Sequence, residues 1–118
     1  MAGTHVTVLC KQPLQGRMLQ AALAEAGCQT TVCESDDQVG AQAKRGNSKL
    51  VVLFDPSPKH MALIAPLRKL GCLVLWAGPV SSPYGFTWLA EQGAFMVPAQ
   101  ARAIRSVVSL LLLSRRAG

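Results

Sequence analysis

The chain has 118 residues, of which 50% are hydrophobic, enough for one domain that builds its core without disulfide or metal support. Its 12 Lys and Arg residues against 6 Asp and Glu residues give a formal net charge of +6. No apolar run approaches the length of a membrane span, and the start lacks the charged and apolar regions of a secretory signal. We therefore expect a single domain over residues 1–118, in a soluble cytoplasmic protein or cut from a larger one.

The cationic side chains are spread in pairs along the chain, and most pairs fall where helices are expected to end or turn into solvent. This pattern predicts a solvated surface, with an acidic partner as the alternative. Nucleic-acid binding is not favoured, because the chain lacks a helix-turn-helix or an aromatic stacking platform. The cysteines show no C-x-x-C spacing and no nearby His, so we expect buried thiols and no metal or cofactor. They are Cys10, Cys28, Cys33 and Cys72.

Hydrophobic periodicity and turn residues predict strands that alternate with helices along the whole chain. In chain order these are a strand over residues 6–9, a helix over 14–26, a strand over 30–33, a helix over 38–45, a strand over 50–54, a helix over 60–70, a strand over 72–76, a helix over 86–92, a strand over 94–97 and a helix over 101–115. Ser35 followed by two acids is typical of a helix N-cap. Pro66 predicts that the third helix is kinked or starts late.

Five βα units of about 20 to 25 residues each predict an α/β domain with three layers. The strand Leu50–Phe54 is apolar on both faces, which favours a parallel sheet covered by helices on each side. Right-handed crossovers then favour the doubly wound, flavodoxin-like form with strand order 2-1-3-4-5. In this order the tips of strands one, three and four meet at one edge, which would place Cys10-Lys11, Phe54-Asp55 and Trp76 close together.

With this order the chain resembles the receiver domain of bacterial two-component response regulators over essentially its whole length. The resemblance is carried by the βα units, by a third strand that runs into a carboxylate and a Pro-containing loop, and by Gly93-Ala94 leading to a strand that ends at Pro98. It implies a family chemistry in which an aspartate accepts a phosphoryl group. That chemistry uses two acids after strand one for Mg²⁺, a Ser or Thr after strand four, and a Lys before a Pro after strand five.

Each of those functional positions departs from the family pattern in this chain. Cys10 and Lys11 replace the acid pair, so hard oxygen ligands for Mg²⁺ are missing. Counting from the start of strand three places Phe54 in register with the phosphoacceptor and Asp55 one residue later, on the opposite face. The hydroxyl position falls on Trp76 and the lysine position on Val97. The resemblance therefore indicates a degenerate receiver, or pseudo-receiver.

Several alternative roles are possible for the residues at these degenerate positions. The Asp55 carboxylate is expected to serve the turn with Pro56, or to pair with Lys11 in place of a metal. Asp55 remains a candidate phosphoacceptor if strand three is shifted by one residue. Cys10 is a candidate phosphocysteine because it precedes a helix N-terminus, although Arg17 is one residue too far away for a phosphatase loop. His5 and His60 fit no triad or metal spacing, and we expect both at the surface.

The last helix carries apolar side chains on the face that is predicted to be exposed to solvent. Leu110 and Leu113 lie there with Arg102, opposite the core stripe, and this suggests a contact surface. The resemblance implies that helix four, strand five and helix five form the partner or dimer interface. Tyr84 and Trp88 add aromatic side chains beside it. The candidate interface residues are Tyr84, Trp88, Arg102, Arg105, Leu110 and Leu113.

Together these patterns predict a non-catalytic regulatory module of a bacterial two-component signalling protein. It is expected to act by protein–protein contact, with a protein partner, a second copy or other domains of a larger signalling chain. The alternative is a phosphoryl-accepting domain that uses Asp55 or Cys10.

Overall fold

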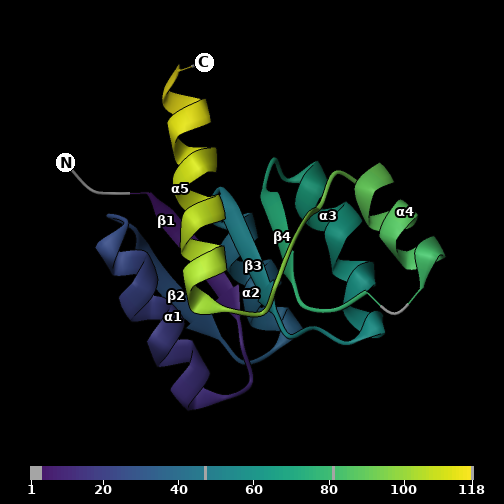
Figure 1. Cartoon of the computed structure of the whole chain (residues 1–118), viewed down its shortest axis with the longest axis horizontal. Helices are drawn as coiled ribbons and strands as arrows, with labels where there is room; N and C mark the ends of the chain where they lie inside the picture. The colour runs from purple at the N-terminus through teal and green to yellow at the C-terminus, as the bar shows by residue number, and fades with distance from the viewer. Residues whose placement is uncertain (1–3, 47, 81, 118) are drawn as a thin grey trace.

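Five parallel strands form a single sheet in the order β2-β1-β3-β4-β5 (Figure 1). The strands are β1 (His5–Leu9), β2 (Gln29–Cys33), β3 (Leu50–Phe54), β4 (Leu73–Ala77) and β5 (Phe95–Val97). The structure is a computed structural model that describes residues 4–46, 48–80 and 82–117. The predicted fold class and strand order are confirmed.

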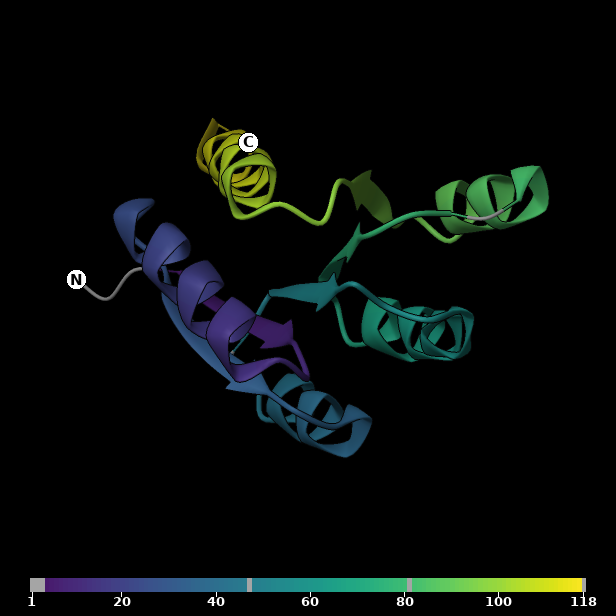
Figure 2. The ribbon, with the colours of Figure 1, turned by 60° about the horizontal axis from the view of Figure 1, so that its bottom comes forward.

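Helices cover both faces of this sheet (Figure 2). They are α1 (Pro13–Glu25), α2 (Asp36–Lys44), the 3-10 helix η1 (Pro58–Leu63), α3 (Ile64–Lys69), α4 (Pro83–Glu91) and α5 (Ala101–Ala117). Residues of α1 and α5 share one core cluster with one face of the sheet, and residues of α2, α3 and α4 share a second cluster with the other face. The two clusters make the predicted three layers.

Strand β3 shows why the sequence selects this arrangement. Leu50 and Val52 belong to the α1–α5 cluster, whereas Val51 and Leu53 belong to the α2–α4 cluster. All four side chains are buried. Because neighbouring side chains on a strand point to opposite faces, a strand that is apolar at every position can be satisfied only between two helical layers.

Among the described residues, four of the five α-helices start one to four residues from the predicted position, and the two largest differences, at α3 and α4, have a clear cause. The chain between β3 and β4 first forms η1, and the α-helix begins only at Ile64, so Pro66 lies in its first turn, where a missing N–H costs nothing. The fourth helix begins at Pro83 rather than at residue 86, because Ser82 caps it by accepting a hydrogen bond of 3.1 Å from the Gly85 N–H. The late start of α3 confirms the prediction made from Pro66, whereas the start of α4 comes from a cap hydrogen bond that hydrophobic periodicity does not report.

The loops after β3 and β4 pack closely at the carboxyl edge of the sheet. A Cβ built on Gly78 would lie 3.0 Å from Cδ of Pro56 and 3.5 Å from Cα of Asp55. The Asp55 N–H donates a hydrogen bond of 2.8 Å to the Ala77 carbonyl, which extends the β3–β4 pairing by one residue. This packing holds the loop after β3 in place and so shapes the edge where the candidate site lies.

Candidate functional site

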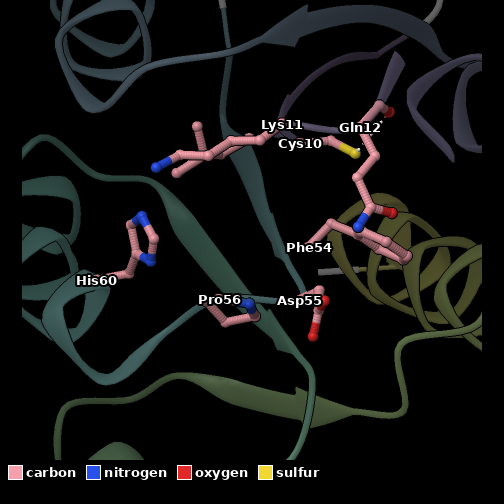
Figure 3. A pocket seen from close by; sticks show the side chains of 8 residues that line it. Cys10, Lys11, Gln12, Phe54, Asp55, Pro56 and His60 are labelled. Carbon is pink, nitrogen blue, oxygen red and sulfur yellow. Dashed lines mark hydrogen bonds between the residues drawn. The ribbon is translucent and has the colours of Figure 1, made fainter. Parts of the chain in front are cut away.

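A small cavity lies at the carboxyl edge of the sheet, between the ends of β1 and β3 (Figure 3). Its volume is about 60 Å³, enough for ordered water molecules or a small group. The lining residues are Leu9, Cys10, Lys11, Gln12, Phe54, Asp55, Pro56 and His60. The structure therefore brings together four of the six predicted positions, and they surround a space suited only to small groups.

Cys10 lies at the end of β1 and is buried. Its thiol donates a hydrogen bond of 3.3 Å to the Gln12 carbonyl, and its backbone N–H donates one of 2.9 Å to the Cys33 carbonyl. The sulfur is thus buried and already engaged in a hydrogen bond within its own loop. The local geometry therefore favours a structural thiol over the nucleophile that a phosphocysteine would require.

Asp55 adopts a left-handed backbone conformation, with φ at 47°. Asp tolerates this region better than most residues, although it still costs about 1 kcal/mol relative to Gly. The side chain is exposed, and no hydrogen bond of its carboxylate is found within the described residues. The prediction that this carboxylate serves the turn is therefore wrong, because the backbone of Asp55 makes the turn instead.

Lys11 does not pair with Asp55, which corrects a second expectation. Within the described part of the chain the contacts between oppositely charged groups are Arg105–Glu25 and, when the ring is protonated, His60–Asp36. In Figure 3 the Lys11 side chain extends toward His60 and away from Asp55. Because both side chains are exposed, water solvates each charge, and little energy is available to hold an ion pair across the mouth of the cavity.

Phe54 ends β3, and its half-buried side chain packs against the α1–α5 core cluster. A large apolar ring thus occupies the last position of the strand, next to Cys10 on the same face. In Figure 3 the Asp55 carboxylate points in a different direction from the Phe54 ring. The wall between β1 and β3 is therefore apolar on the side where Phe54 lies.

The other two predicted positions, Trp76 and Val97, do not line the cavity. Trp76 is buried in the α2–α4 cluster, and its Nε1–H donates a hydrogen bond of 3.4 Å to the Pro79 carbonyl. Val97 is buried in the α1–α5 cluster. Both side chains are core residues, and neither presents a hydroxyl or an ammonium group to the carboxyl edge.

His60 is a candidate functional residue that the sequence pattern did not identify. It was expected at the surface, yet it is only 5% exposed and lines the cavity. The Ser57 N–H donates a hydrogen bond of 3.0 Å to Nδ1, and Nε2 lies 3.4 Å from Oδ1 of Asp36. The signal that sequence reasoning passed over is Ser57 with His60 three residues later, because this spacing is that of a capping box with His as the acceptor. His5 is half-buried, and its Nε2 lies 2.7 Å from Oγ1 of Thr31.

The groups around the cavity offer little for metal chemistry. Among residues 4–46, 48–80 and 82–117, no three His, Cys, Asp or Glu side chains lie close enough together to hold a metal ion. All four cysteines are buried and free, as expected. Burial raises the pKa of the Cys28, Cys33 and Cys72 thiols, which keeps them protonated and unreactive at neutral pH.

The predicted interface residues differ in how freely they are presented. Tyr84 is 87% exposed, Leu110 is 63% exposed and Leu113 is 60% exposed. Trp88 is half-buried against the α2–α4 cluster, and Arg105 donates a hydrogen bond of 2.5 Å to Oε2 of Glu25 on α1. Arg102 is exposed. Tyr84, Arg102 and the two leucines are thus the predicted interface side chains that remain available for a partner.

A broad groove, which sequence reasoning did not anticipate, lies between α4 and the end of β5. It has a volume of about 530 Å³ and is lined mainly by apolar side chains of the loop after β4, of α4 and of the β5 end. They are Gly78, Pro79, Val80, Phe86, Met96, Val97, Pro98 and Ala99. In Figures 1 and 2, α4 and α5 lie on the two sides of β5, so the groove occupies the α4 side of this surface.

Solved structures that share this fold include several receiver domains. The response regulator receiver domain protein (CheY-like) from Methanospirillum hungatei is 14% identical and covers 98% of each chain with a TM-score of 0.81. HP1043, an orphan response regulator of H. pylori, is 17% identical, with a TM-score of 0.78 over 95% of this chain and 96% of its own. The structure of an atypical orphan response regulator, described as revealing a phosphorylation-independent regulatory mechanism, is 18% identical, with a TM-score of 0.73 over 90% of each chain.

The chain therefore has the receiver, CheY-like fold. No family model matches the sequence, and no curated protein matches it. Over the part of the chain that the structure describes, no helix has the length and apolar character needed to cross a bilayer.

Proposed function

We propose that this chain is a non-catalytic pseudo-receiver module of a bacterial two-component signalling protein, acting in the cytoplasm through protein–protein contact. The observation that supports this function best is the composition of the cavity between β1 and β3. At the end of β1 it presents Cys10 and Lys11, and the Cys10 thiol is already bonded to the Gln12 carbonyl. Receiver chemistry needs two carboxylates at this place.

The missing groups matter because a carboxylate and a phosphoryl group repel each other. Transfer requires cations that neutralise the charge and hold both reactants in line. Mg²⁺ performs this role only when oxygen ligands hold it, and Asp55 is the one carboxylate among the residues that line the cavity. Lys11 supplies a positive charge, but it points away from Asp55 (Figure 3). Phosphorylation of Asp55 would thus lack both its metal and a nearby ammonium group.

The proposed contact surface is made by α4, β5 and α5. Tyr84 on α4 and the leucines Leu110 and Leu113 on α5 expose large apolar areas to water. Such areas are typical of protein interfaces, and aromatic side chains often serve as their anchors. The apolar groove beside Phe86 and Met96 extends this surface toward the carboxyl edge. A protein partner, a second copy or a neighbouring domain of the same signalling chain would cover it.

Intact mass spectrometry tests the absence of phosphoryl transfer. The chain is incubated with acetyl phosphate and Mg²⁺, with an active receiver domain in parallel as the positive control. The expected result is no gain of a phosphoryl group. A mass gain that disappears in Asp55→Asn or in Cys10→Ser would contradict the proposal. Asn is chosen at position 55 because it tolerates the left-handed backbone, so that a loss of signal would not reflect strain.

The alternative function is a phosphoryl-accepting domain that uses Asp55 or Cys10. It is supported by one observation, which is that both residues line the same cavity. The same experiment separates the two functions, and the two variants identify the acceptor.

A further inference from the structure

Exposed cations gather at one end of the layer formed by α2 and α3. Lys44 and Arg45 end α2, Arg68 and Lys69 end α3, and Lys49 precedes β3. All five side chains are exposed. Because helices run antiparallel to the strands in a parallel α/β fold, both helix ends lie at the amino edge of the sheet, and Figure 2 shows α2 and α3 side by side. We call these five residues the basic edge patch.

Backbone contacts show that the patch is continuous between β3 and α3. The Leu73 N–H donates a hydrogen bond of 2.8 Å to the Lys49 carbonyl, and Nη1 of Arg68 donates one of 3.1 Å to the Cys72 carbonyl. Burial raises the pKa of the Cys72 thiol, whereas the charges of Lys49 and Arg68 both act to lower it. The two cations therefore flank Cys72 closely enough to act on the same atom.

Stabilisation of the helix dipole does not account for the basic edge patch. The last turns of α1 and α4 carry no basic residue, although their ends have the same partial negative charge. Lys49 lies outside any helix, before β3. Within the described residues no ion pair involves a member of the patch. The cations therefore concentrate at one place, and apart from the hydrogen bond of Arg68 to the Cys72 carbonyl no internal contact of their charged groups accounts for them.

The acidic residues leave this end of the layer almost entirely. Glu34, Asp36 and Asp37 lie at the opposite end of α2, and Asp55 lies at the carboxyl edge of β3. Of the remaining two, Glu25 pairs with Arg105. Glu91 ends α4 and is the one acid at this end of the layer, close to Arg68, since a Cβ built on Gly93 would lie 3.3 Å from Nε of Arg68. The patch thus produces a local positive potential stronger than the average net charge of the chain suggests.

Leu70 lies next to Lys69 at the end of α3 and is 43% exposed. An apolar side chain surrounded by charges repeats the layout of protein interfaces, which have an apolar centre and a polar rim. No residue of the patch is aromatic, so the stacking platform of single-stranded nucleic-acid binders is missing. We propose that the basic edge patch, with Leu70, binds an acidic protein segment whose carboxylates surround an apolar side chain. This inference does not depend on the proposed function, because it uses a different surface.

Fluorescence anisotropy with the full chain tests this inference. The probe is a labelled peptide of alternating glutamate and leucine, titrated at low and at physiological salt. The test variant is Lys44→Glu/Lys69→Glu, and the control is Arg17→Glu/Lys59→Glu, which changes the net charge equally at exposed positions outside the patch. We expect binding that weakens about tenfold in the test variant, because two exposed ion pairs become like-charge contacts. Circular dichroism checks that each variant is folded.

Leu70→Ser separates specific binding from charge attraction alone, and we expect it to weaken peptide binding several-fold without a change in net charge. A labelled DNA duplex serves as a second probe. The inference is overturned if the wild-type chain does not bind the peptide, if both double variants lose binding equally, if Leu70→Ser has no effect, or if the duplex binds more tightly than the peptide.

Discussion

Nε2 of His60 lies 3.4 Å from Oδ1 of Asp36, and this contact joins η1 to the first residue of α2. On the other side of the ring, the Ser57 N–H donates a hydrogen bond of 3.0 Å to Nδ1. A nitrogen that accepts this bond carries no proton, so the neutral ring has its proton on Nε2, facing the carboxylate. The ring is thus anchored to the loop after β3 and lies beside the N-terminus of α2, on the wall of the cavity, with Nε2 buried and without a hydrogen bond.

Replacement of this ring should destabilise the fold. His60→Ala removes a buried side chain and leaves the Ser57 N–H without its acceptor, so we expect the free energy of unfolding to fall by about 2 kcal/mol. Urea denaturation followed by circular dichroism measures it. The control is Lys59→Ala, at the exposed neighbouring position, with an expected change within about 0.5 kcal/mol. Equal stability of the two variants would show that the ring contributes nothing.

Two glycines should respond to alanine with opposite signs. Gly78→Ala should lower the free energy of unfolding by about 1 to 2 kcal/mol, because the new Cβ would lie 3.0 Å from Cδ of Pro56. Gly40→Ala should raise it by about 0.5 to 1 kcal/mol, since Gly40 lies inside α2 and no atom lies within 4 Å of the new Cβ. Thermal or urea denaturation of both variants checks this. Stabilisation by Gly78→Ala would mean that the two loops separate without cost.

Substitutions on the exposed face of α5 should abolish the proposed contact without lowering the stability of the fold. Leu110→Glu/Leu113→Glu should reduce self-association or partner capture and leave the free energy of unfolding unchanged within about 1 kcal/mol, because both side chains are exposed. Sedimentation velocity and pull-down with the partner measure this. Leu14→Glu/Met18→Glu is the matched control, since it makes the same change on the exposed face of α1. If both double variants behave like the wild type, α5 is not the interface.

The buried thiols should make stability depend on pH in the alkaline range. Burial raises the pKa of Cys28, Cys33 and Cys72 above the ordinary value of 9.0, so the folded state holds its thiol protons more strongly than the unfolded state. The contribution of the protonated thiols to the free energy of unfolding is therefore fully present below pH 9.0. It is lost as the pH rises through the thiol pKa values of the folded state. We expect the urea midpoint to fall between pH 8 and pH 10.

The control for this pH dependence is the triple variant Cys28→Ala/Cys33→Ala/Cys72→Ala. It should show a smaller fall over the same range, whatever its stability at pH 8. An identical fall in both proteins would assign the effect to other groups.

The layered fold could be predicted because it depends on the pattern of apolar residues. Leu50–Phe54 is apolar at every position, and only a strand between two helical layers buries such a run. The start of α4 could not be predicted in this way, because it depends on the single hydrogen bond between Ser82 and Gly85. The exposed leucines on α5 were predicted from helical spacing, and Leu110 and Leu113 are indeed at the surface.

The sequence by itself determined the strand order, the two core faces and the replacement of acids by Cys10 and Lys11, because these depend on residue type and short-range spacing. Only the tertiary structure decided how the groups at the carboxyl edge meet. In the folded chain His60 is buried beside Asp36, and Asp55 adopts a left-handed backbone conformation. The Lys11 side chain points away from Asp55. These outcomes depend on side-chain directions and on contacts between loops distant in sequence, which no local pattern encodes.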